Sequence, residues 1–109
     1  MEKETVLNAV KDIVLNLIWK NYREVVEKDT MKLIPAKELQ IAIEEYPGSI
    51  TMPPDNAFDK MDIYVINDKT IAVDMDLWYD DKQSDLTLSC KIMENGGKIG
   101  YSIENVHIL

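Results

Sequence analysis

The chain contains a single cysteine, Cys90, and a single histidine, His107, among its 109 residues. One cysteine excludes an internal disulfide and fits a reducing compartment. Cysteine and histidine are also too few for a zinc site, which takes three or four such ligands. Disulfide-stapled domains and zinc domains are therefore excluded.

Long hydrophobic runs are absent too. No apolar stretch approaches the ~20 residues of a membrane-spanning helix, and Met1–Thr5 lacks the basic start of a signal peptide. Gly-rich phosphate loops, Gly-x-Ser-x-Gly turns and basic-aromatic patches are missing as well. The sequence therefore predicts a cytoplasmic, non-enzymatic protein with no cofactor, no metal, no nucleic-acid partner and no membrane partner.

Positive charge is scarce. Twelve lysines and arginines face 20 acids, and the formal net charge is −8. Residues 54–85 alone hold nine aspartates against three lysines, a net of −6. A field of this kind attracts cationic partners and repels nucleic acid and anionic membranes. With 46% hydrophobic and 29% charged residues, the composition is that of a folded protein, and the length predicts a single domain, residues 1–109.

The first half of the chain has helical periodicity. Apolar residues at spacings of three and four predict one long helix over residues 4–27. A second helix is expected from Pro35, which suits a first helical turn, to the stop at Pro47-Gly48. Residues 49–56 contain two consecutive prolines and are expected to form an irregular connection.

From residue 58 onward the apolar period changes to two, which is typical of strands. Asn95-Gly96 favours a type I′ hairpin turn, and a reversal of the apolar phase near Glu104-Asn105 predicts a β-bulge. The order of elements predicts an α+β fold (ααββββ) in which two N-terminal helices pack on one face of a curved four-stranded antiparallel meander. The expected strands cover residues 58–66, 71–79, 86–92 and 97–109.

The strand at residues 71–79 should separate an apolar face from an acidic one. If its aliphatic residues face the core, Asp74, Asp76 and Trp78 share the opposite face, where side chains two residues apart stand about 6–7 Å from each other. Polar residues of the next two strands should lie on the same face: Thr87, Ser89, Lys91, Ser102 and Glu104.

Four interpretations of this acidic face are open. It is the solvated side of an amphipathic strand, a binding face with Trp78 and Tyr79 as aromatic anchors, a catalytic carboxylate pair, or an Asp-x-Asp metal site. The metal site lacks the glycine and the glutamate of a calcium loop. Among the functional interpretations we favour a binding face for a basic protein, with these contact residues: Asp74, Asp76, Trp78, Tyr79, Asp80, Asp81 and Asp85.

Three further features complete the expectations. Cys90 falls in the apolar phase of its strand and is predicted to be a core residue. His107 is either a general base oriented by Asp74 or Asp76, or a half-buried residue bonded to the backbone. A spare strand edge at residues 58–66 or 97–109 would allow a homodimer.

Three segments resemble an uncharacterised family of small, acidic bacterial α+β domains: Val73–Trp78, Ser84–Leu88 and Ile103–Leu109. This resemblance implies no activity. In size, charge and class the chain is also similar to immunity proteins that neutralise basic nuclease toxins, which implies a non-enzymatic inhibitor. The order of its elements is loosely similar to NTF2-like domains. That likeness implies, as the alternative, a small-ligand-binding domain or a small enzyme with an aspartate in an apolar pocket.

Overall fold

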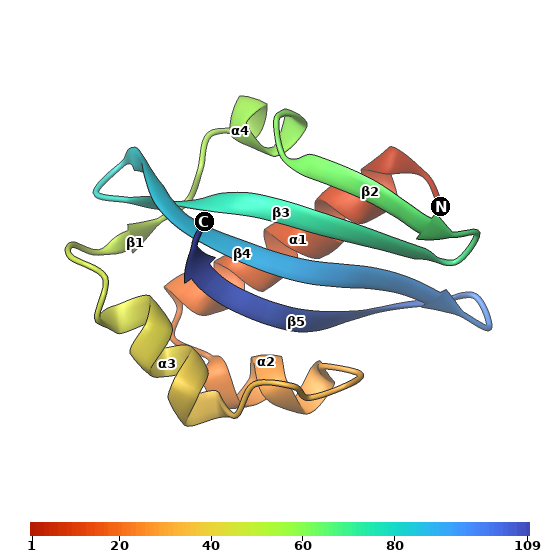
Figure 1. Cartoon of the computed structure of the whole chain (residues 1–109), viewed down its shortest axis with the longest axis horizontal. Helices are drawn as coiled ribbons and strands as arrows, with labels where there is room; N and C mark the ends of the chain where they lie inside the picture. The colour runs from red at the N-terminus through yellow and green to blue at the C-terminus, as the bar shows by residue number, and fades with distance from the viewer.

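The computed structural model describes residues 1–109 and has four helices and a five-stranded antiparallel sheet (Figure 1). The α+β class is confirmed. The ααββββ layout is wrong, because the first helix is broken and a short strand and a short helix lie before the meander. The elements are α1 (Lys3–Ile18), α2 (Tyr22–Lys28), α3 (Ala36–Glu44), β1 (Ile50–Thr51), α4 (Asp55–Asp59), β2 (Asp62–Asn67), β3 (Thr70–Tyr79), β4 (Lys82–Asn95) and β5 (Lys98–Ile108).

The break between α1 and α2 corrects the prediction of one helix over residues 4–27. Lys20 adopts a left-handed conformation with φ of 61°. The Lys20 N–H donates to the Leu17 carbonyl, and the Asn21 N–H donates to the Asn16 carbonyl at 2.9 Å. These two bonds form a Schellman motif, which satisfies carbonyls at a helix end. Glycine usually occupies the left-handed position at a helix end. Because lysine stands there in this chain, the sequence gives no signal that α1 ends.

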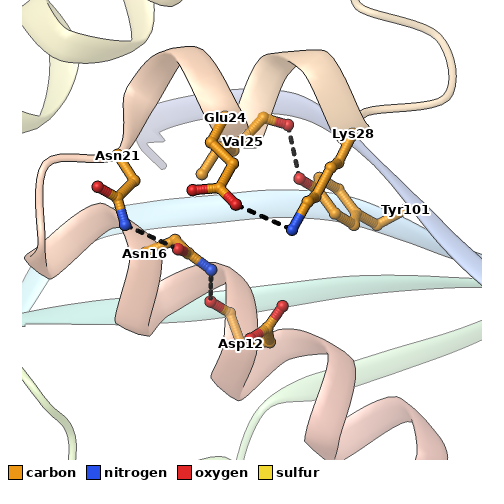
Figure 2. Close-up of polar contacts among 7 residues, drawn as sticks. All are labelled: Asp12, Asn16, Asn21, Glu24, Val25, Lys28 and Tyr101. Atoms are coloured by element: carbon orange, nitrogen blue, oxygen red, sulfur yellow. Dashed lines mark hydrogen bonds and ion pairs between the residues drawn. The ribbon is translucent and has the colours of Figure 1, made fainter.

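Side-chain contacts hold α2 in its new direction (Figure 2). The Asn21 amide donates to the Asn16 side-chain oxygen at 3.0 Å, across the break. The Tyr101 hydroxyl, on β5, donates to the Val25 carbonyl at 2.5 Å. The second contact joins residues 76 positions apart in the chain, so α2 is fixed to the sheet as well as to α1.

The prediction of an irregular connection over residues 49–56 is also wrong. Ile50 and Thr51 pair with the end of β3 as strand β1. Helix α4 begins directly after Pro54, whose missing N–H costs nothing at a helix start. Its Phe58 side chain is only 1% exposed and anchors this short helix in the core.

β3 lies at the centre of the sheet. β1 and β2 pair with different parts of one edge of β3, β4 pairs with the other edge, and β5 pairs with β4. Alternate residues of β3 are buried, and we call their side of the sheet the inner face: Ile71, Val73, Met75, Leu77 and Tyr79. Helix α1 passes behind the sheet on this side in Figure 1, while the opposite side, the outer face, points toward the viewer.

The hairpins and bulges set the register of the sheet. A bulge is confirmed where it was predicted: Ser89 pairs with Asn105 but Cys90 with Ile103, so Glu104 is the extra residue. The turn after β4 differs by one residue from the prediction, because Asn95 pairs with Lys98 and both central residues, Gly96 and Gly97, have positive φ. Two consecutive positive φ values are what a type I′ turn requires.

The buried carboxylate of Asp29 clips the chain after α2 to the edge of β5. Asp29 is 3% exposed. Its Oδ1 accepts bonds from the N–H groups of Met31 and Lys32, and its Oδ2 accepts one from the Ile103 N–H at 2.8 Å. The Thr30 N–H donates to the Tyr101 carbonyl beside it. Together these bonds occupy part of the free edge of β5.

Asp29→Ala should lower the free energy of unfolding by about 2–4 kcal/mol, because it removes the acceptor of three N–H groups, one of them buried. Urea unfolding followed by circular dichroism measures the change. Asp59→Ala is the matched control, since Asp59 is exposed and makes no hydrogen bond through its side chain. Equal losses of unfolding free energy in the two variants would contradict the stabilising role of the Asp29 hydrogen bonds.

Candidate functional site

The outer face carries a hollow of about 220 Å³ beside α4 and the C-terminus. Trp78 and Gln83 line one part of it, and the last residue, Leu109, lies at another. Three of the lining residues are aspartates, and Lys60 is the one base among them. We call this hollow the acidic pocket, and its carboxylates are those of Asp62, Asp74 and Asp76.

Helix α4 forms one wall of the acidic pocket through Asn56, Ala57 and the residue that follows the helix, Lys60. The wall is held in place from below by the buried Phe58 side chain. The Lys11 ammonium, on α1, lies 3.5 Å from an Asp55 carboxylate oxygen and 5.3 Å from the Phe58 ring centre. The position of the wall therefore depends on contacts with the core and with α1.

Asp62 and Asp74 lie directly opposite each other on neighbouring strands. Like charges at opposed positions of an antiparallel pair destabilise the sheet. Asp62 makes no hydrogen bond or ion pair through its carboxylate, and it is exposed. Asp62 was not among the predicted contact residues. It alternates with the apolar residues Met61 and Ile63, and this alternation could have placed it on the polar face of its strand.

Asp76 and Asp74 are each held by side chains of β4. Thr87 donates to Asp76 Oδ1 at 3.0 Å, and Gln83 donates to Asp76 Oδ2 at 2.8 Å. The Ser89 hydroxyl donates to Asp74 Oδ1 at 2.6 Å. These bonds orient both carboxylates and leave each with lone pairs free for a further donor.

His107 lies on the outer face because the bulge at Glu104 shifts the end of β5. His107 pairs with Thr87 across the strands, and its Nε2 is 3.2 Å from the Ser89 oxygen. Since Ser89 gives its proton to Asp74, His107 must carry a proton on Nε2 and donate it to Ser89. Ser89 therefore separates His107 from Asp74, whereas a catalytic triad has its histidine in the middle.

The structure divides the predicted contact residues into three groups. Asp74, Asp76 and Trp78 line the acidic pocket. Tyr79 does not belong with them, because it lies on the inner face, is buried, and donates to the Ile43 carbonyl at 2.5 Å. The strict alternation along β3 sends Tyr79 to the side opposite Trp78. The third group does not line the pocket: Asp80 and Asp81 form the turn between β3 and β4, and Asp85 lies on β4 near this turn.

Two of these three acids, Asp80 and Asp85, bond through their carboxylates to neighbouring parts of the chain. Asp80 and Asp81 form the turn, with φ of 51° and 61°. Asp80 Oδ1 accepts from the Ser49 N–H at 3.1 Å, and Gly48 packs so closely that an added Cβ would lie 2.4 Å from Asp80 Oδ2. Asp85 accepts the Tyr46 hydroxyl at 2.6 Å. Asp80 and Asp85 thus have structural contacts that Asp62 lacks.

Burial of Tyr79 predicts an alkaline weakening of the fold. Desolvation, with a smaller effect of Tyr46, raises the pKa of Tyr79 to about 12 from 10.0. Between these two pH values the folded state keeps a proton that the unfolded state loses. The free energy of unfolding is therefore unaffected by Tyr79 below about pH 10 and falls as the pH rises toward 12.

Tyr79→Phe tests this effect by urea unfolding at neutral and alkaline pH. At neutral pH the variant should be less stable by about 1 kcal/mol, because the bond to Ile43 is lost. The deficit should shrink above about pH 10, since phenylalanine has no proton to lose. Tyr64→Phe is the control, because Tyr64 is 52% exposed. A deficit that stays constant with pH would contradict the burial effect.

Cys90 is a core residue, as predicted. It is 1% exposed, and burial raises the pKa of its thiol to about 12. Nowhere in the chain do three His, Cys, Asp or Glu side chains come together in a way that could hold a metal ion. None of the helices has the length and apolar character needed to cross a membrane.

Comparison with known proteins identifies the family. Residues 14–109 match the model of a domain of unknown function, DUF7668. The chain belongs to this family. The match confirms the resemblance to an uncharacterised domain family, whereas the likeness to immunity proteins and NTF2-like domains stays a prediction. No curated protein and no solved structure matches the chain.

Proposed function

We propose that the protein is a non-enzymatic module that binds a basic protein, and that the acidic pocket receives an arginine or lysine side chain of this partner. The observation that carries the proposal is the unmatched charge of the pocket: three carboxylates, one of them without any bond, face a single lysine. A bound cation would remove the repulsion between the opposed Asp62 and Asp74.

The size and the lining of the acidic pocket favour one side chain of a protein over a free ligand. Its volume of about 220 Å³ is below the roughly 300–1,000 Å³ of pockets that enclose small molecules. Trp78 adds an aromatic surface, on which an arginine guanidinium gains a cation–π contact worth about 0.5–1 kcal/mol at an exposed site. An acidic surface beside an aromatic residue is a common way to bind arginine.

The specific role that we propose is that of an immunity-type inhibitor, which neutralises a basic toxin domain of the nuclease kind. The net charge of −8 supports fast capture of such a partner through electrostatic steering. The alternative, an NTF2-like domain with an aspartate in an apolar pocket, has less support. Asp74 and Asp76 lie on the face of the sheet opposite α1 and bond to polar side chains.

An arginine-rich peptide is a direct probe of the acidic pocket. In a Trp19→Phe background, which removes the other, 70% exposed tryptophan, peptide binding should change the fluorescence of Trp78. The double variant Asp62→Asn/Asp76→Asn should bind the peptide about tenfold more weakly, because each carboxylate contributes about 0.5–1 kcal/mol at a partly exposed site.

The matched control is Glu27→Gln/Glu45→Gln, which changes the net charge equally but alters exposed acids on the helical side. Equal weakening in the two double variants would show that only net charge matters and would contradict the proposed site. Capture of a basic protein from a lysate of the source cell, lost in the pocket variant and kept in the control, would identify the partner.

A further inference from the structure

The acidic pocket lies where one edge of β3 has no strand partner. β2 pairs with β3 as far as Asp74, and β1 pairs with it from Trp78 onward. Between these two pairings Asp76 faces no strand on this edge, and α4 forms the wall instead. The pocket therefore extends along β3, with the opposed Asp62 and Asp74 at one end and Trp78 at the other.

A single cation cannot contact both ends of the acidic pocket. Asp74 and Trp78 are four residues apart on one strand, which corresponds to about 13 Å along β3. A guanidinium or an ammonium group is much smaller than this distance. Three carboxylates and one ammonium group also leave the lining with a net charge of −2, so one bound cation would leave it acidic. Distance and charge both indicate two cation positions.

The first position lies between Trp78 and Asp76. Gln83 connects these two residues, because it pairs with Trp78 across the strands and its side-chain amide donates to Asp76 Oδ2 at 2.8 Å. A guanidinium that stacks on the indole ring can therefore also bond to the Asp76 carboxylate. This position suits arginine, whose planar group combines aromatic stacking with bonds to carboxylates.

The second position lies between Asp62 and Asp74. Directly opposed residues of an antiparallel pair have Cβ atoms about 4.5–5.5 Å apart, so one cation can contact both carboxylates. Ser89 bonds to Oδ1 of Asp74, which leaves Oδ2 for the cation. Asp74 and Asp76 are two residues apart on the same face, so the two positions are about 6–7 Å from each other.

We propose that the two positions take two basic side chains of one extended segment of the partner, at least one of them arginine, separated by a single residue. This inference rests on the proposed function and specifies the partner sequence that the acidic pocket selects. In an extended chain, side chains two residues apart point to the same side, about 6–7 Å from each other. Side chains one or three residues apart point to opposite sides. Only a spacing of two residues matches both positions.

Four labelled peptides of equal length and charge test the spacing by fluorescence anisotropy at low salt. Each has two arginines in a neutral sequence, with zero, one, two or three residues between them. The peptide with one intervening residue should bind about threefold more tightly than the others, because it alone places a cation at each position. Tightest binding with two or three intervening residues would indicate a helical segment and overturns the proposal.

Asp62→Asn should abolish the preference, so that peptides with one and two intervening residues bind equally well. Asp59→Asn is the matched control and should keep the preference, because Asp59 is exposed and does not line the pocket. A preference that survives Asp62→Asn overturns the two positions. Equal affinity of all four peptides for the wild type, lost in Asp62→Asn/Asp76→Asn, overturns the spacing but supports the proposed function. Affinities that this double variant does not lower overturn both.

Discussion

The alternation of side chains along β3 is the constraint on which the rest of the structure depends. Every second residue from Ile71 to Tyr79 is buried against the helices. Because the side-chain period of a strand is two, this burial sends Asp74, Asp76 and Trp78 to the outer face. β3 also pairs with three other strands, so its register decides which of their residues join these acids. The core and the acidic pocket are two consequences of one pattern.

Bulges then decide which residues meet on the outer face. The turn pairs Asn67 with Thr70, and an uninterrupted ladder from there would place Asp62 opposite Met75. The bulge at Ile66 shifts the pairing by one residue and places Asp62 opposite Asp74 instead. The bulge at Glu104 has the same effect on β5, where it brings His107 to the outer face beside Ser89. Each shift by one residue exchanges the faces of everything beyond it.

These facts explain which parts of the structure could be predicted from the sequence. The α+β class, the long strands, the bulge at Glu104 and the outward side of Asp74 and Asp76 follow from local periodicity, which a sequence displays. The end of α1 at Lys20 does not follow from periodicity, because a lysine takes the left-handed position that glycine usually occupies at such a site. Asp29 gives no local signal either, since its carboxylate bonds to a residue 74 positions away. The pairing of Asp62 with Asp74 depends on the bulge at Ile66, for which the sequence has no recognisable pattern.

The distribution of charge on the outer face favours a binding site over a merely solvated surface. Farther along the same face, Lys91 and Glu104 are matched, with their charged atoms 3.5 Å apart. In the acidic pocket the arrangement is different, because Asp62 faces Asp74 and its carboxylate bonds to nothing. A lysine at either position would remove this repulsion, so the acids cost stability where they stand. Unmatched carboxylates beside the half-buried Trp78 form the surface on which we propose that a cation binds, since arginine can use both the carboxylates and the aromatic ring.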